Sequence, residues 1–497
     1  MPPTAAPPDY WPFVVLIVCV GFIIVAIAKL RLHAFIALIA AALLAGFLSR
    51  PFSPAVLGKL PAGTRAAAEG NQWLATVELT MIEFGNTAGA IAISIGLAAI
   101  IGLALMESGA ADKVVRRFLA LFGEKRAGIA LLVSTYILSI PIFFDTMFML
   151  MVPLAKALRL RTGRDYLLYL MAICAGGVVM HSMTVPHPGP LAMVDNLQVD
   201  VGASLVWGIL AGIIPAGVGY WFSTWLNRRT EIPLRETPGS ALADLEGISA
   251  KPESALPSFL ASITPVVLPI LLITFASFFT VVQKSYPAVV ASLGGPEAFA
   301  AVGKWVAFIG NKNIALLIGT VIALWILARQ RGLGLRQVES LIGPPIETAG
   351  VIILITSAGG AFGLMLRNAG VGDAIKAAAA GHEVNLLLLA WLVAAVIRVA
   401  QGSATVAMLT TSAMVFPMMD PAAGAVLPFN PMYVYLAIGF GAFTSSWMND
   451  SGFWVVSRLS GMTEGETLKS WTVMLTVTSV TGLLVTLVFA KLLPLAG

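Results

Sequence analysis

The 497-residue sequence has few charged residues and almost no cysteine. Lys, Arg, Asp and Glu together make up 11% of the chain, whereas 58% of its residues are hydrophobic. The mean hydropathy is +0.90, and apolar segments long enough to span a bilayer recur throughout, so we expect an all-α polytopic membrane protein. Cys19 and Cys174 both lie in apolar runs, which favours buried small hydrophobic residues over a disulfide or a metal site.

Sequence motifs of common enzymes are also missing. The sequence contains no His-Glu-x-x-His zinc spacing and no Gly-x-Ser-x-Gly nucleophile elbow, both of which are typical of hydrolases. We therefore expect that the protein is not an enzyme and needs no metal or other cofactor. The formal net charge of +5 does not indicate nucleic-acid binding, because basic residues that flank membrane spans are an ordinary consequence of topology.

The apolar segments predict ten membrane helices and two re-entrant hairpins. The first segment lacks the basic region and the cleavage site of a secretory signal, so we expect it to be a retained helix. A segment rich in charge, Pro and Ser, residues 227–258, is interpreted as a linker without chemistry between repeats at 1–226 and 259–497. The predicted helices are 11–28, 33–49, 87–106, 166–192, 204–225, 261–282, 307–328, 347–366, 432–454 and 470–492, and the hairpins occupy about 128–155 and 384–416.

The two halves of the chain resemble each other. At an offset of 261 and without gaps, residues 86–112 align with residues 347–373, and even the polar residues at the helix ends coincide. At an offset near 265, residues 172–185 align with residues 437–450. Because each half then crosses the membrane five times, an odd number, the halves are predicted to be inverted repeats. Chance similarity between helices rich in small residues is the alternative explanation.

The basic residues are distributed unevenly over this predicted topology. Loops on one side hold 20 of the 30 Lys and Arg residues, Lys113, Arg161, Arg229 and Arg331 among them. The positive-inside rule makes that side cytoplasmic. We therefore expect a multi-pass protein of the cell (inner) membrane, with the linker in the cytoplasm and both termini outside.

Polar residues, prolines and glycines interrupt the apolar segments at equivalent places in the two halves. The first half is interrupted at residues 139–145 and 181–190, and the second half at residues 398–405 and 449–452. Such breaks are costly in hydrocarbon unless the freed backbone groups face protein or a water-filled cavity. Paired breaks at matching positions therefore indicate a solute site, and they suit alternating access in a secondary transporter better than a channel.

Several short motifs at these breaks resemble the gluconate permease family, which belongs to a superfamily of ion transporters. They are residues 140–145 (Ile-Pro-Ile-Phe-Phe-Asp), 186–190 (Pro-His-Pro-Gly-Pro), 402–407 (Gly-Ser-Ala-Thr-Val-Ala) and 449–454 (Asn-Asp-Ser-Gly-Phe-Trp). The resemblance covers nearly the whole chain. It implies a proton-coupled carrier of gluconate or a related sugar acid, built as a homodimer in which an elevator-type transport domain moves against a scaffold. The family usually has His-Gly-Phe-Leu-Pro where this chain has residues 181–185, so the particular sugar acid stays open.

The substrate contacts are expected at these motifs. Half-helix N-termini near the midplane offer unpaired N–H groups and about half a positive charge each, which suits a carboxylate. The hydroxyl groups of a sugar acid then need hydroxyl, amide and imidazole partners. The predicted substrate-binding residues are Phe144, Asp145, Thr146, His181, Ser182, Pro186, His187, Gly189, Gly402, Ser403, Thr405, Ser445, Ser446, Asn449, Asp450 and Ser451.

Proton coupling is predicted at Asp145, His187 and Asp450. Ionisable groups at membrane depth are costly and usually functional, and a carboxylate that loses its water can load and release a proton during a cycle. The alternative for each aspartate is a permanently ionised helix cap, and for the histidine a structural role. Arg398 either pairs with the substrate or stabilises the base of the second hairpin. The alternative function is a sodium-coupled carrier of di- or tricarboxylates or of another organic anion.

Overall fold

The computed structural model describes residues 10–30, 32–235, 252–285, 290–291, 295–371, 374, 385–419, 426–448 and 450–495. These residues form helices and connecting loops, and no strand occurs among them, which confirms the all-α prediction. Within the same residues, seven helices are long and apolar enough to cross a membrane. The chain is therefore a multi-pass helical protein.

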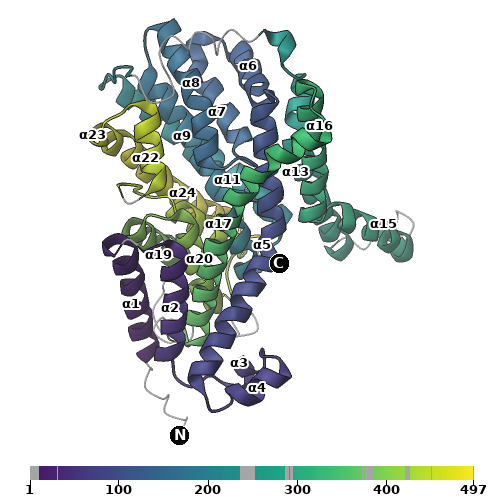
Figure 1. Cartoon of the computed structure of the whole chain (residues 1–497), viewed down its shortest axis with the longest axis vertical. Coiled ribbons are helices and arrows are strands. Elements are labelled where there is room, and N and C mark those ends of the chain that lie inside the picture. The colour runs from purple at the N-terminus through teal and green to yellow at the C-terminus, as the bar shows by residue number, and fades with distance from the viewer. Residues whose placement is uncertain are drawn as a thin grey trace.

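Two long helices, α5 (Gln72–Glu107) and α17 (Leu335–Asn368), pack against each other through the length of the molecule (Figure 1). They contain the segments that align between the two halves. Both are longer than the predicted helices 87–106 and 347–366, and the 36 residues of α5 span about 54 Å. The prediction was too short because polar residues before position 87 were excluded, whereas Glu83 is buried and pairs with Lys59 at 2.9 Å.

The flanking helices carry the outer surface of the molecule. Helix α2 packs on α5 and α17 and is covered by α1, whereas α16 packs on α5 and α13 (Figure 1). The predicted helix 307–328 is wrong at its start, because Asn311 caps a new helix by accepting from the Asn313 N–H at 3.0 Å. Exposed apolar side chains such as Phe278 and Trp325 suit contact with lipid. These helices are α1 (Trp11–Ile24), α2 (Ala34–Leu48), α13 (Phe259–Ser285), α15 (Gly295–Ile309) and α16 (Lys312–Arg331).

Both predicted hairpins are pairs of helices joined by tight turns. Residues 139–143, which include Pro141, form the first turn, and Gly402 with Ser403 forms the second. Gly402 ends its helix with φ of +84°, a left-handed conformation that a residue with a Cβ adopts at a cost. The first pair is α7 (Ala127–Leu138) and α8 (Phe144–Thr162), and the second is α19 (Leu386–Gln401) and α20 (Ala404–Val415).

Both predicted broken helices are also present, and each break is followed by a further half-helix. In the first, α9 (Tyr166–Met183) stops before Thr184 and α10 (Pro188–Leu197) begins at a proline, which is well suited to a first helical position. In the second, α21 (Met432–Gly441) and α22 (Ser451–Ser460) flank the loop 442–450. One continuous helix follows each broken segment. Helix α11 (Val201–Asn227) follows the first, and α24 (Val473–Leu492) follows the second.

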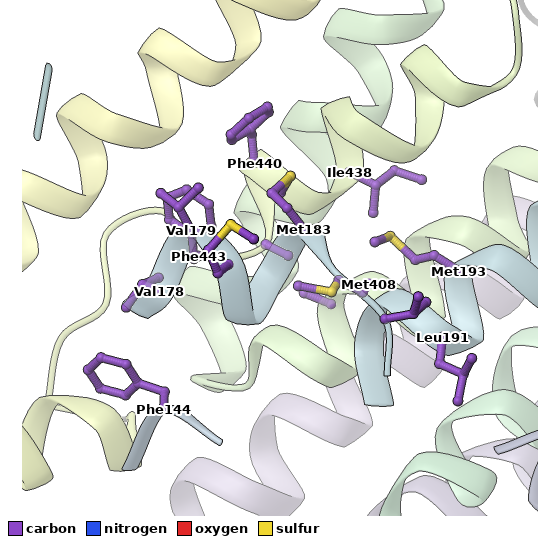
Figure 2. Packing of buried hydrophobic residues seen from close by; sticks show 14 of the residues in the cluster. Phe144, Val178, Val179, Met183, Leu191, Met193, Met408, Ile438, Phe440 and Phe443 are labelled. Atoms are coloured by element: carbon purple, nitrogen blue, oxygen red, sulfur yellow. The ribbon is translucent and has the colours of Figure 1, made fainter. Parts of the chain in front are cut away.

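The broken helices form the centre of the core. All residues of α10 and α21 except Asp195 and Asn196 are buried, and in α9 His181 alone is half-exposed. Figure 2 shows side chains from both halves in this core, with Met183 from α9 next to Phe440 of α21 and Met408 from α20 on the side towards Leu191 of α10. The first break, residues 184–187, is thus enclosed by protein, as a non-helical backbone at membrane depth requires, whereas Trp447 and Met448 of the second break are exposed.

Some elements lie wholly or partly outside the predicted helices. The amphipathic helix α6 was missed because its basic residues were assigned to a loop, and the predicted last helix 470–492 begins instead with a π-helical turn. Among these elements are α3 (Pro54–Leu57), α4 (Ala62–Ala68), α6 (Ala110–Phe122), α23 (Glu464–Thr467) and the π-turn Leu468–Thr472.

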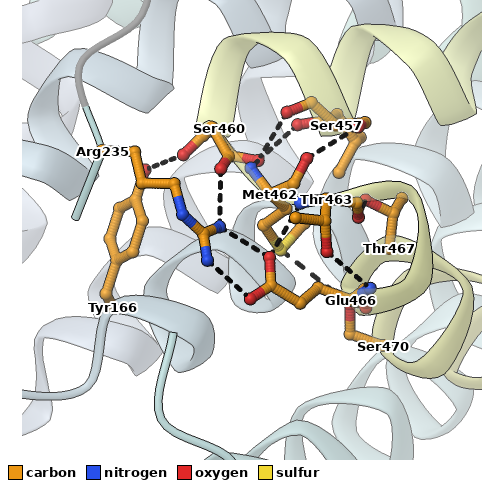
Figure 3. Close-up of polar contacts among 11 residues, drawn as sticks. Tyr166, Arg235, Ser457, Ser460, Met462, Thr463, Glu466, Thr467 and Ser470 are labelled. Atoms are coloured by element: carbon orange, nitrogen blue, oxygen red, sulfur yellow. Dashed lines mark hydrogen bonds and ion pairs between the residues drawn. The ribbon is translucent and has the colours of Figure 1, made fainter. Parts of the chain in front are cut away.

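The two ends of the predicted linker are docked on helices. The Arg235 guanidinium donates to both carboxylate oxygens of Glu466, at 2.6 and 2.9 Å (Figure 3), and these hydrogen bonds raise the pKa of Arg235. At the other end Glu253 pairs with Lys113 at 2.6 Å, which lowers the pKa of the Glu253 carboxyl. Residues 236–251 lie outside the described residues.

Candidate functional site

A cavity lies where the two hairpin turns and the two breaks meet. Four helices begin at its wall. Lining residues from their first turns are Phe144 and Asp145 of α8, Pro188 of α10, Ala404 and Thr405 of α20, and Ser451 and Gly452 of α22. Because every helix N-terminus presents unpaired N–H groups and a partial positive charge, their convergence makes the cavity a natural anion site.

The four N-termini differ in how they are capped. Ser403 accepts from the Val406 N–H at 3.3 Å, and Asp450 accepts from the Gly452 N–H at 3.1 Å, so α20 and α22 carry side-chain caps. The residues before α8 and α10, Phe143 and His187, provide no side-chain cap. Two of the four N-termini therefore keep backbone N–H groups for a ligand, and α8 keeps more of them because prolines occupy two positions in the first turn of α10.

A buried ion pair connects the second hairpin with the second broken helix. Arg398 of α19 donates to the Asp450 carboxylate and to the Gly402 carbonyl at the hairpin turn. Ser446 donates to the same carboxylate, and Trp471 donates to the Ser446 hydroxyl at 2.8 Å. Arg398 and Asp450 are only 4% and 7% exposed, so their charges compensate each other inside the protein.

The remaining carboxylate of the cavity, Asp145, has different surroundings. It lies in the first turn of α8, and its side chain is exposed to the cavity. Among the described residues, none donates a hydrogen bond to this carboxylate or forms an ion pair with it. Within the described residues, Asp145 is therefore the cavity carboxylate that has no cationic partner.

The two histidines of the first broken helix lie side by side. Their ring centroids are 4.2 Å apart, and Phe143 packs against both rings. His187 is buried, and its Nε2 is 2.6 Å from the Ser139 carbonyl, which can only accept, so Nε2 carries a proton. His181 lines the cavity. His181 thus lies at the cavity wall, whereas His187 lies behind His181 and is not part of the wall.

Several polar atoms at the cavity wall lack a protein partner. In the described part of the chain, His181 Nδ1, Ser182 Oγ and Thr356 Oγ1 are buried without a hydrogen bond, and their residues line the cavity. Buried polar groups are normally paired, so these atoms are available to water or to the hydroxyl groups of a ligand. The wall also contains an aromatic pair, Phe144 and Trp471, with ring centroids 5.3 Å apart.

The cavity brings together nine of the predicted substrate-binding residues and leaves others behind it. Gly189 packs against α20, where a Cβ would lie 2.4 Å from Met408 Sδ. Ser446 donates to Asp450 without reaching the wall, and Pro186 lines a separate small apolar pocket. Asn449 lies outside the described residues. The nine are Phe144, Asp145, His181, Ser182, Gly402, Ser403, Thr405, Asp450 and Ser451, whereas Thr146, Pro186, His187, Gly189, Ser445 and Ser446 are not at the cavity wall.

The sequence analysis did not name several wall residues, some of which lie inside the quoted motifs and others on helices that were treated as plain spans. Thr356, next to Ser357 in an apolar run, was a signal that could have been used. Trp471 carried no such signal, because its approach to the cavity depends on the π-turn that precedes α24. The missed residues are Phe143, Val178, Pro188, Ile352, Ile355, Thr356, Ala404, Phe443, Gly452, Trp471 and Leu475.

Comparisons with known proteins agree with these features. The sequence profile described as GntP family permease matches residues 11–492. A gluconate permease of Pseudomonas aeruginosa is 32% identical over 481 residues, which are 96% of this chain and 97% of that protein. The Gnt-II system L-idonate transporter of Escherichia coli is 31% identical, over 95% and 98% of the two chains. These relatives are permeases and transporters, not enzymes.

Two solved structures share the fold at low sequence identity. The YdaH transporter of Alcanivorax borkumensis superposes with a TM-score of 0.60 and 13% identity, over 93% of this chain and 98% of that chain. MtrF of Neisseria gonorrhoeae, described as one of a class of antimetabolite efflux pumps, gives 0.62 and 16%, over 96% and 97%. At these identities the likeness concerns the fold alone.

Proposed function

The chain belongs to the GntP permease family, and from this premise we propose that it imports gluconate or a related sugar acid by proton symport. The observation that carries the proposal is the convergence of four helix N-termini on one cavity. The uncapped N-terminus of α8 offers N–H groups for the carboxylate of the substrate. The unpaired atoms of His181, Ser182 and Thr356 suit its hydroxyl groups.

Proton coupling follows from the charges in the cavity. Arg398 and Asp450 already compensate each other, so a bound sugar acid adds its negative charge close to Asp145 at the same helix end. Two carboxylates in one site repel each other, and a proton on one of them removes the repulsion. Among the three predicted coupling residues we therefore propose Asp145 as the proton carrier, with His187 and Asp450 as the residues to examine if Asp145 fails. No cofactor is required.

The mechanism that we propose is elevator-type alternating access. The two halves, residues 1–226 and 259–497, would be inverted repeats around the cytoplasmic linker 227–258. Each contributes one hairpin, one broken helix and one following helix to a transport domain, and α1, α2, α5, α13, α16 and α17 form the scaffold. The packing of α5 on α17, and the position of the hairpins beside the broken helices, support this division. We further propose a homodimer in the cell membrane, with both termini outside.

Counterflow in liposomes tests the substrate class without depending on the coupling ion. Liposomes that contain the purified protein are loaded with unlabelled gluconate and then diluted into labelled gluconate with no pH or sodium gradient. We expect transient accumulation of label, which other aldonates inhibit when they are added outside. Glucose, which has no carboxylate, serves as the control and should not inhibit. Inhibition by citrate or succinate, but not by aldonates, would instead identify the di- or tricarboxylate carrier.

A further inference from the structure

A continuous series of hydrogen bonds connects the π-helical turn before α24 with the turn of the second hairpin. Trp471 Nε1 donates to Ser446 Oγ at 2.8 Å, and the Ser446 hydroxyl donates to the Asp450 carboxylate. Arg398 donates to the same carboxylate oxygen and to the carbonyl of Gly402. All four side chains are buried. The turn that begins α20 is therefore linked to the π-helical turn through side chains from three separate segments.

The direction of these hydrogen bonds is fixed by chemistry. An indole N–H can only donate, so the Ser446 oxygen must accept from Trp471, and the single Ser446 proton is left for Asp450. The Asp450 carboxylate then accepts from Ser446, from Arg398 and from the Gly452 N–H at 3.1 Å. The Asp450 carboxylate thus holds the Arg398 guanidinium in place through these contacts.

The loop that carries Ser446 is itself held against α24. Thr472 donates to the Ser446 carbonyl, and the hydroxyls of Ser445 and Thr476 are 2.9 Å apart. The π-helical turn Leu468–Thr472 brings Trp471 towards this loop, and single π-helical turns of this kind occur often at functional sites. The indole also packs on Phe144 of the first hairpin. Trp471 therefore contacts elements of both halves at the cavity wall.

We propose that Trp471 and Ser446 are positioning residues for sugar-acid binding. They orient Asp450, which orients Arg398, and Arg398 holds the Gly402 carbonyl so that the N-terminus of α20 points into the cavity. The inference rests on the proposed function, because it concerns affinity for the same substrate. It assigns a role to Trp471, which was not a predicted site residue, and it gives Ser446 a positioning role in place of the predicted direct contact with the substrate.

Two single variants and their combination test this series. Trp471→Phe removes the N–H donor and keeps an aromatic ring against Phe144, whereas Ser446→Ala removes the middle member. Each variant loses a hydrogen bond of the series that holds Asp450 and Arg398. We therefore expect each variant to raise the KM for gluconate counterflow about tenfold. Because both act through Asp450, the double variant should show the KM of a single variant rather than an additive rise of about a hundredfold. The maximal rate and its pH dependence should stay near those of the wild type.

The chain offers a matched control. Trp391 Nε1 donates to Ser479 Oγ at 3.1 Å, and Ser479 donates to the Phe440 carbonyl, so the chemistry is the same but no carboxylate follows. Trp391→Phe and Ser479→Ala are expected to keep the wild-type KM. If the Trp471→Phe protein does not accumulate in the membrane, the KM of Ser446→Ala is compared with the KM of Ser479→Ala. Both of these variants remove only a hydroxyl group.

The outcomes separate the inference from the function on which it rests. A wild-type KM in Trp471→Phe and Ser446→Ala overturns the inference, as does an additive double variant or an equal rise in the control variants. A wild-type protein that exchanges no sugar acid at all contradicts the proposed function, and the inference with it. A shared rise in KM that is confined to Trp471 and Ser446 supports the positioning role.

Discussion

The two cavity aspartates show how the same side chain takes different roles in different surroundings. Asp450 accepts hydrogen bonds from Arg398, Ser446 and the Gly452 N–H, whereas Asp145 faces the cavity without a partner among the described residues. A carboxylate held by a guanidinium gives up little by staying ionised. A carboxylate that shares a cavity with an anionic substrate gains from a proton. The contacts therefore favour Asp145 over Asp450 as the group that changes its protonation state.

Replacement of Asp145 by Asn separates coupling from binding. The amide has nearly the shape of a protonated carboxyl but cannot release a proton. We expect Asp145→Asn to abolish proton-driven accumulation of gluconate while counterflow persists, and both are measured in the same liposomes.

Asp200→Asn is the control for this change. Asp200 caps α11 by accepting from the Ala203 N–H at 2.7 Å, away from the cavity, and Asn caps a helix about as well as Asp. This variant should accumulate gluconate as the wild type does. Near-normal accumulation by Asp145→Asn would rule out the coupling role and leave His187 and Asp450 to be tested.

The elements that build the site are short helices that start at tight turns. Helix α20 begins directly after Gly402, whose φ of +84° ends α19 and turns the chain back. The Gly402 carbonyl also receives the Arg398 guanidinium. The conformation of one glycine therefore determines where the N-terminus of α20 points and how the buried ion pair meets the hairpin.

Replacement of Gly402 by Ala tests this dependence. A Cβ in the left-handed conformation costs about 1–2 kcal/mol, so we expect a modest loss of stability together with a rise in the KM for gluconate. Gly332 ends α16 with φ of +65°, and a Cβ there meets nothing within 4 Å. Gly332→Ala should lower the thermal stability in detergent by a similar amount but keep the wild-type KM. Equal KM values in the two variants would show that the hairpin turn does not shape the site.

The sequence predicted the elements that depend on local chemistry. Prolines and glycines that cluster with polar residues favour breaks in helices, so the turns at Pro141 and Gly402 and the break at Thr184 were placed correctly, whereas a single proline such as Pro153 lies inside a helix. The lengths of α5 and α17 were not, because a buried polar residue such as Glu83 is tolerated only through a partner distant in sequence. Tertiary packing of this kind leaves no local pattern.

The candidate site was predictable to a similar extent. The motif residues Asp145, His181 and Ser403 reach the cavity, as their neighbouring prolines and glycines suggested. The pairing of Arg398 with Asp450 was not predicted, because it depends on the position of one hairpin relative to a helix break 52 residues later. Of the aromatic pair at the wall, Phe144 was predicted and Trp471 was not, because the position of Trp471 depends on a π-helical turn.

At the scale of the whole molecule, the two halves supply equivalent elements to one central cavity. Each gives a hairpin and a broken helix, and the long helices α5 and α17 pack together beside them (Figure 1). One uncompensated carboxylate and four helix N-termini then face the same space. A monoanionic substrate with one proton leaves this charge balance unchanged, which is the physical basis of the proposed symport.

Accumulation driven by a pH gradient tests this central claim most directly. The purified protein is placed in sodium-free liposomes, and the outside is acidified by about one pH unit. Such a gradient is worth about 1.4 kcal/mol per proton, which supports about tenfold accumulation of a monoanion that enters with one proton. The account predicts that labelled gluconate reaches this ratio and that a proton uncoupler abolishes it. Accumulation that ignores the pH gradient and appears only when sodium is added would contradict the account.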